Sequence, residues 1–171
     1  MKVSLHMAVS VNGIIAADNG SEDFLSHENW LVFLNKAKEV GSIIWGRTTY
    51  EAVSKWPKDY LDGLKGIVKI IISNDKDYKV DEGFELANSP EQAIELLETK
   101  GFAETIITGG STLNTEFAKR NLINKVSLTM QSVILVSGIP LFKREQFEMK
   151  LKLTKIEKIS DNLIELNYDV I

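Results

Sequence analysis

Hydrophobic and polar residues alternate at the start of the chain, which is the pattern of a β-strand with one buried face. The odd-numbered residues from 3 to 9 are all apolar, and Asn12-Gly13 then signals a turn. From residue 26 to residue 40 the apolar side chains recur at helical spacing, with Ser26 available as N-cap and Gly41 as a stop. The chain therefore begins with a strand, a turn and an amphipathic helix.

The middle of the chain repeats this order with shorter elements. Short apolar strands alternate with helical segments at 42–45, 47–55, 67–73, 90–100, 104–108 and 110–120. A long strand is predicted at 125–136, and a hairpin at 149–170 turns at Ser160-Asp161-Asn162. The alternation predicts an α/β, three-layer fold over residues 1–171 as one domain, with a mixed, mostly parallel central sheet, flanking helices and a C-terminal antiparallel hairpin.

Composition narrows the range of functions. The 171 residues are 44% hydrophobic and carry a net charge of −4 with no basic run, so nucleic acid is not an expected partner. The absence of cysteine excludes a thiolate nucleophile, and two histidines are too few for a His-rich zinc site, so no metal is expected. No apolar run has the length of a membrane span, and we expect a cytoplasmic protein with no membrane partner.

Two strand-to-helix junctions contain glycine: Gly46-Arg47-Thr48-Thr49 and Gly109-Gly110-Ser111-Thr112. In open α/β sheets, ligands bind beyond the carboxyl ends of the strands, where glycine allows close approach of the backbone and helix N-termini attract phosphate. Both junctions suit a phosphate group. A glycine that serves only a tight turn is the alternative at each junction.

Polar residues also follow the strand predicted at 67–73. Ser73 and Asn74 are expected to lie beside Arg47 and Thr48, on neighbouring strand ends. A guanidinium group with hydroxyl and amide donors is suited to a ribose 2′-phosphate, and no acid stands beside either junction. These residues favour NADP over NAD.

At this point the sequence resembles a known superfamily in five ordered blocks. They are Met7-Ala8-Val9-Ser10-Val11-Asn12-Gly13-Ile14-Ile15-Ala16, Ile44-Trp45-Gly46-Arg47-Thr48-Thr49-Tyr50-Glu51, Ile71-Ile72-Ser73-Asn74, Ile107-Thr108-Gly109-Gly110-Ser111, and Lys125-Val126-Ser127-Leu128-Thr129 with Pro140-Leu141-Phe142. Over its whole length the chain resembles dihydrofolate reductases and, equally, the C-terminal reductase domain of the riboflavin-biosynthesis deaminase-reductase, RibD.

The resemblance implies that the cofactor is NADPH and names the residues that hold it. Ala8 and Ile15 would contact the nicotinamide end. The 2′-phosphate would meet Arg47, Thr48, Ser73 and Asn74, and the pyrophosphate would meet Thr49, Gly109, Gly110, Ser111 and Thr112. Gly46 is a further expected cofactor-binding residue. The resemblance also implies a cis Gly109-Gly110 peptide.

On the substrate side, a gapless count back from Gly46 puts Trp30 at the position of the folate enzymes' pocket carboxylate. Thr129 aligns with the threonine that supports that acid. Trp30 and Phe33 are expected on the inner face of the first helix, where either can stack on a flat heteroaromatic substrate or serve as a plain core aromatic. The residue that assists protonation in folate enzymes is thus replaced.

A different group must then supply a proton. His6 is the first candidate, because the ordinary pKa of histidine, about 6.5, suits proton donation near neutrality. Asp23 and Glu28, near the start of the first helix, are further candidates. The alternatives are a structural role for His6 and a helix-dipole role for the two acids.

The sequence therefore predicts an NADPH-dependent reductase that transfers hydride to a small pyrimidine, pterin or related heterocycle or carbonyl. It would be similar to 5-amino-6-(5-phosphoribosylamino)uracil reductase. A dihydrofolate reductase with a displaced acid such as Glu28, and an NADP-binding protein without turnover, are the alternatives. The apolar run Val133–Val136 and the terminal hairpin suggest a homodimer interface, with completion of the sheet as the alternative role.

Overall fold

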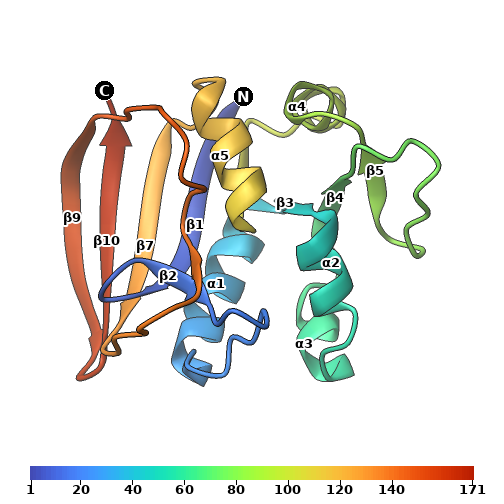
Figure 1. Ribbon diagram of the computed structural model, residues 1–171. Helices are drawn as coiled ribbons and strands as arrows, with labels where there is room; N and C mark the ends of the chain where they lie inside the picture. The colour runs from blue at the N-terminus through green and yellow to red at the C-terminus, as the bar shows by residue number, and fades with distance from the viewer.

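The computed structural model describes all residues from 1 to 171 and contains one mixed sheet of eight strands (Figure 1). The strand order is β5-β4-β3-β6-β1-β7-β10-β9, and only β10 runs antiparallel to its neighbours β7 and β9. These strands are β1 (Lys2–Ser10), β3 (Ser42–Gly46), β4 (Val68–Ile72), β5 (Glu85–Ala87), β6 (Glu104–Ile107), β7 (Lys125–Gln131), β9 (Leu151–Ser160) and β10 (Leu163–Val170). A separate pair joins β2 (Ile14–Ala16) to β8 (Ile139–Pro140).

Five helices cover the two faces of the sheet and make the predicted three layers. They are α1 (His27–Val40), α2 (Arg47–Val53), α3 (Lys58–Gly63), α4 (Pro90–Thr99) and α5 (Ser111–Lys119). One hydrophobic core joins α4 and α5 to the sheet, and a second joins α1 and α2 to it. No helix is long and apolar enough to cross a membrane. The predicted α/β architecture with a terminal antiparallel hairpin is confirmed.

Alternation along the strands separates these two cores. On β3, Ile44 packs with α4 and α5, whereas Ile43 and Trp45 pack with α1 and α2. β1 places its odd-numbered residues, from Val3 to Val9, in the α4–α5 core. Its even-numbered residues point to the opposite face because side chains alternate along a strand. His6 consequently lies on the α1 face of the sheet.

Side-chain and glycine caps fix the ends of the two long helices as the sequence predicts. Ser26 Oγ accepts a hydrogen bond from the backbone N–H of Asn29, at 3.2 Å, and begins α1. Gly41 ends that helix at a φ of +80°, in the left-handed region that glycine adopts without a Cβ clash. Ser89 caps α4 in the same way, accepting from Gln92 N at 3.1 Å.

The prediction that the long strand reaches Val136 is wrong, because β7 ends at Gln131. Beyond it the backbone turns: Val133 N donates to Gln131 O, and Leu135 N donates to the side chain of Asn12. Asn12 also donates to Leu135 O, at 2.7 Å, so the turn after β1 clamps this segment. The apolar residues that suggested a strand therefore lie in a loop, where Ile134 and Val136 are exposed.

Candidate functional site

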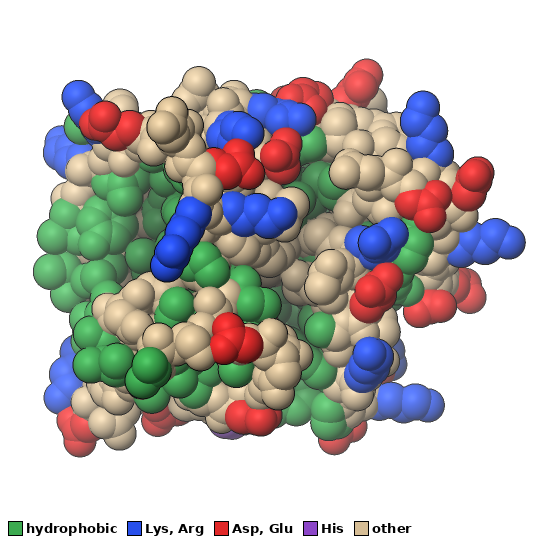
Figure 2. Space-filling model, viewed as in Figure 1, with side chains coloured by type: hydrophobic (Ala, Val, Ile, Leu, Met, Phe, Trp, Pro, Cys, Tyr) green, Lys and Arg blue, Asp and Glu red, His purple; other side chains and the backbone are tan.

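The largest hollow of the molecule is a cleft of about 1410 Å³ at the carboxyl ends of the parallel strands. It passes between the β2–α1 loop and β8 on one side and α2, α3 and the start of α5 on the other. The surface in Figure 2 is hollowed in this central region. A much smaller hollow, of about 330 Å³, lies at the other end of the sheet beside Ile123 and Ile171. The cleft is where the rule for open α/β sheets puts a ligand.

Two glycine junctions meet in the cleft, because β3 and β6 are neighbours in the sheet. Gly46 N donates to Gly109 O at 3.2 Å, and the Gly109-Gly110 peptide is cis, as the resemblance implied. Gly109 has a φ of +91°, and a Cβ there would come within 3.1 Å of Met7 Cε. The left-handed φ therefore favours glycine at this position, and the buried Met7 side chain would have to shift by a few tenths of an ångström to admit a Cβ.

The start of α5 lines the same side of the cleft. Ser111 and Thr112 lie in its first turn, and the ideal Cβ position of Gly110 is 3.6 Å from Thr49 Oγ1. Ser111 is 93% buried, yet its hydroxyl group has no hydrogen-bond partner in the protein. A buried donor without a partner is unfavourable, so this hydroxyl is available to a ligand oxygen in the cleft.

Arg47, Thr48, Ser73 and Asn74 all line the cleft, as predicted. They come together because Gly46 at the end of β3 is paired with Ile72 at the end of β4. Ser73 is almost fully buried, whereas the Arg47 side chain is 47% exposed. The arrangement supplies a guanidinium group beside hydroxyl and amide donors.

The expectation that no acid stands beside these junctions is wrong. Arg47 Nε lies 3.6 Å from Glu51 Oε1, one helical turn further on, and the guanidinium carbon lies 5.5 Å from the centre of the Tyr78 ring. The hydroxyl group of Tyr78 donates to the same carboxylate at 3.1 Å. Glu51 and Tyr78 thus hold Arg47 from two sides, while Glu51 lowers the net positive charge of this corner.

His6 lines the cleft but is 97% buried, and neither ring nitrogen has a hydrogen-bond partner. Burial lowers the pKa of His6 to about 4, with Lys36 acting in the same direction and Glu165, 3.9 Å from Nδ1, opposing it. Glu165 itself accepts from Ser127 Oγ at 2.7 Å. His6 is neutral at pH 7, so the premise that made it the first proton donor, a pKa near 6.5, does not hold in the fold.

The residue paired with Thr129 is Asn29, not Trp30. Thr129 Oγ1 donates to Asn29 Oδ1 at 2.5 Å, and both side chains are buried. If Thr129 marks the supporting threonine of the folate enzymes, an amide occupies the position of their pocket acid. The gapless count was wrong by one residue. The conclusion that an ionisable acid is missing there stands, because an amide has no acidic proton.

Of the three predicted acid or base candidates, His6 and Asp23 line the cleft and Glu28 does not. Glu28 instead accepts a hydrogen bond from Ser160 Oγ at 2.7 Å. Glu22, which nothing in the sequence singled out, also lines the cleft. More than a third of its surface is open, yet the surrounding protein desolvates its carboxyl group and raises the pKa of Glu22 to about 7.

Aromatic side chains make up one wall of the cleft. Trp30 and Phe33 of α1 lie there as predicted, with ring centres 5.4 Å apart. Trp56 and Tyr60 were not singled out in the sequence, but their rings lie 5.9 and 4.8 Å from the ring of Trp30. Ala8 and Ile15, predicted near the nicotinamide, line the cleft as well.

This fold and cleft define a class of protein. The chain matches the model of the RibD C-terminal domain over residues 1–164 and belongs to that family. It is 31% identical to the uncharacterized protein YwjB of Bacillus subtilis (strain 168) over 172 residues, covering 98% of this chain and 97% of YwjB. It is 24% identical to YyaP of the same organism, also described as uncharacterized, covering 98% of this chain and 94% of YyaP.

Solved structures share the fold. A protein from Shewanella sp. PV-4 matches at a TM-score of 0.79 and 24% identity, covering 100% of this chain and 99% of that one. The deaminase/5-amino-6-(5-phosphoribosylamino)uracil reductase of Thermotoga maritima matches at 0.78 and 15% identity, covering 99% of this chain and 56% of that one. A pyrimidine reductase-like protein from Corynebacterium diphtheriae matches at 0.77 and 14%, covering 99% and 92%.

Proposed function

We propose that the protein is an NADPH-dependent reductase of the riboflavin-biosynthesis type, acting on a small heterocycle. Membership of the RibD C-terminal domain family supports an oxidoreductase. The observation that carries the proposal is the corner where Arg47 and the buried Ser73 meet beyond β3 and β4. A guanidinium group beside hydroxyl donors suits the ribose 2′-phosphate that distinguishes NADPH from NADH.

The second half of the cofactor fits the start of α5. The orphaned, buried hydroxyl of Ser111 and the backbone N–H groups of the first turn of this helix suit a pyrophosphate. Gly109 has no side chain here, and a Cβ at this residue would lie 3.1 Å from Met7 Cε, closer than ordinary van der Waals contact. We propose Thr49, Gly110 and Thr112 as further contacts of the pyrophosphate, and Ala8 and Ile15 as contacts of the nicotinamide. NADPH, when bound, supplies the hydride.

The chain's own contribution would be to position both reactants and to supply a proton. We propose Glu22 as the proton donor in place of His6. Its pKa of about 7 leaves a large fraction protonated at neutral pH, whereas His6, with a pKa of about 4, holds no transferable proton at that pH. Asn29 in place of an acid argues against dihydrofolate reduction by the folate enzymes' own route.

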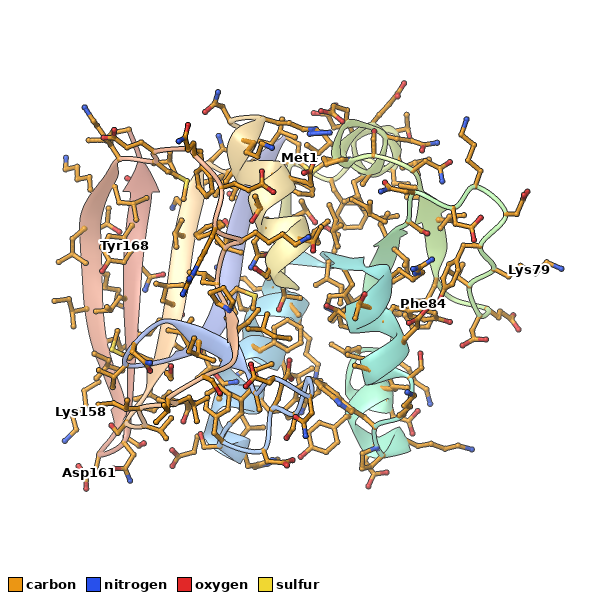
Figure 3. All side chains as sticks on the ribbon, viewed as in Figure 1. Met1, Lys79, Phe84, Lys158, Asp161 and Tyr168 are labelled. Carbon is orange, nitrogen blue, oxygen red and sulfur yellow. The ribbon has the colours of Figure 1, made fainter.

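We further propose a homodimer formed through the terminal hairpin. Leu151, Leu153 and Ile156 of β9 are exposed and pair with apolar residues of β10, which include Tyr168 (Figure 3). Figure 2 shows a broad hydrophobic area on its left side, where Figure 1 has β9 and β10. Sedimentation analysis tests this: we expect a dimer that Leu153→Lys converts to monomer, and a monomeric native chain would contradict it.

Thermal unfolding with NADPH or NADH at equal concentration tests the cofactor proposal without a known substrate. A ligand that binds only the folded protein raises its stability by RT ln(1 + [L]/Kd). We expect a clear rise in Tm with NADPH and a smaller one with NADH. Equal Tm shifts with the two nucleotides would contradict the 2′-phosphate assignment. No Tm shift with either nucleotide would contradict the proposed function.

A further inference from the structure

The substrate side of the cleft has a wall of aromatic rings that exceeds the needs of helix packing. Trp30, Trp56 and Tyr60 meet edge to face, with ring centres 4.8 to 5.9 Å apart. All three remain partly exposed and line the cleft, although aromatic side chains of this size contribute most to stability when they are fully buried. A cluster of partly exposed rings facing a cleft is suited to a flat apolar or heteroaromatic ligand.

Asn29 adds a directional polar group beside this wall. Its Oδ1 is taken by the hydroxyl of Thr129, which fixes the orientation of the amide. Its Nδ2 donates to no protein group and is not fully enclosed, and the residue lines the cleft, so this donor is open to a ligand there. A buried amide donor held by a second side chain recognises a carbonyl oxygen or a ring nitrogen. The ligand should therefore be a flat ring with an acceptor at its edge.

Charge on this side of the cleft does not suit an anion. The acids Glu22 and Asp23 lie on the β2–α1 loop, and the basic side chains that line the same region are Lys55 and His27. Arg47 lies at the other end of the cleft, where it meets Glu51. Arg120 and Lys143 also line the cleft, and Arg120 pairs with Glu91 and Glu116. Because Glu51, Asp75 and Glu116 belong to the same lining, the cleft has no excess of positive charge.

The N-terminus of α1 does not provide an alternative phosphate site. Its backbone N–H at Asn29 is already capped by the Ser26 hydroxyl. Glu28 lies in its first turn, and Asp23 precedes it in the loop. These carboxylates offset the positive end of the helix dipole, which would otherwise attract an anionic group.

Resting on the proposed reductase function, we propose that the substrate is a flat heteroaromatic ring without a phosphate or carboxylate tail, bound against Trp30, Trp56 and Tyr60 with an edge acceptor at Asn29. This class differs from a phosphoribosyl pyrimidine, which the Thermotoga maritima protein is named for reducing. The aromatic wall provides the affinity. Of the two acids on the β2–α1 loop, which form an acidic rim, Asp23 provides the main repulsion of an anionic tail at pH 7, because Glu22 is partly protonated there. Specificity of this kind combines an attractive and a repulsive element.

Quenching of tryptophan fluorescence tests the inference with two matched pairs of probes. The first pair is 5-amino-6-(ribosylamino)uracil and its 5-phosphate, and the second is pterin and pterin-6-carboxylate. We expect the member without the anionic group to bind more tightly in at least one pair. If neither pair shows this preference, the inference is overturned. The titrations need no NADPH, so a failure of the proposed cofactor to bind would be recognised separately.

Variants of the wall and of the rim sharpen this test. Trp56→Leu should weaken binding of the uncharged probe at least tenfold, whereas Phe84→Leu, a change in an aromatic cluster outside the cleft, should not. Asp23→Asn should reduce the difference in affinity between the uncharged and the anionic probe of each pair. Asp77→Asn changes an exposed acid outside the cleft and should leave that difference unchanged. The rim changes do not disturb a core, so they remain informative if Trp56→Leu fails to fold. An unchanged difference in Asp23→Asn would overturn the role of the acidic rim.

Discussion

The two ends of the cleft are built in different ways. The end proposed for the cofactor consists, apart from the Arg47 side chain, of backbone and short side chains at the carboxyl ends of β3, β4 and β6, which adjacent parallel strands bring together. The end proposed for the substrate consists of long side chains from the β2–α1 loop, α1 and the α2–α3 segment. The first end is fixed by sheet topology, whereas the second can change its chemistry one side chain at a time. A family can thus keep its cofactor and vary its substrate.

The largest expected effect lies at the substrate end. Glu22→Gln should lower kcat/KM about 100-fold at pH 6, the scale of a lost general acid. In the native protein kcat/KM should fall as pH rises through about 7, because the raised pKa of Glu22 makes it protonated below that pH and ionised above it. Pre-steady-state or steady-state pH profiles check this. The control variant Asp23→Asn should retain the pH dependence of kcat/KM. If Glu22→Gln keeps the native pH profile, Glu22 is not the proton donor.

At the cofactor end, Gly109→Ala should reduce the free energy of unfolding by about 2 to 4 kcal/mol. A left-handed φ costs a non-glycine residue about 1 to 2 kcal/mol, and crowding of the new Cβ against Met7 adds to that. Gly66→Ala is the matched control, since Gly66 has a φ of +81° and no neighbour within 4 Å of a Cβ. Urea denaturation measures both variants. Equal losses would mean that close packing is not what keeps glycine at residue 109.

Arg47→Ala should weaken NADPH binding by about 1.5 to 3 kcal/mol, the value of a charge-assisted contact, and leave NADH binding nearly unchanged. Calorimetric titration of both nucleotides separates these effects. Arg144→Ala changes an exposed arginine outside the cleft and should affect neither. Equal weakening for both nucleotides would show that Arg47 does not distinguish the 2′-phosphate.

The smallest effect, on stability, is expected at the buried hydrogen bond between Thr129 and Asn29. Thr129→Val removes the donor to Asn29 Oδ1 and should cost about 1 to 2 kcal/mol of stability, because a buried acceptor loses its partner. Thr105→Val offers a control: Thr105 is equally buried, but its hydroxyl has no partner, so its removal should be neutral or stabilising. Denaturation curves compare the two. A cost as large for Thr105→Val would mean that packing, not the hydrogen bond, explains the first loss.

This contrast also explains what the sequence could predict. Gly46 and Gly109 mark strand ends locally, so their place at one edge of the sheet followed from the alternation of strands and helices. Asn29 was missed by one residue because its role depends on a contact with Thr129, 100 positions away. The raised pKa of Glu22 likewise arises from desolvation in the folded protein, which a polar loop in the sequence does not reveal.

The same reasoning applies to the secondary structure. Strong signals such as the Ser26 cap placed α1 correctly. The apolar, β-branched run after Gln131 suggested more strand than exists, because its backbone partners, among them Asn12, belong to a loop that local propensity does not describe. The six-residue α3 was missed since it is too short to show a helical period.

The central claim is that the backbone end of the cleft binds NADPH. A crystal structure of the protein grown with NADPH tests it most directly. We expect the 2′-phosphate within hydrogen-bond distance of Arg47 and Ser73, and a pyrophosphate oxygen on the Ser111 hydroxyl. A dinucleotide bound with its 2′-phosphate elsewhere, or with its adenosine against the aromatic wall, would contradict it.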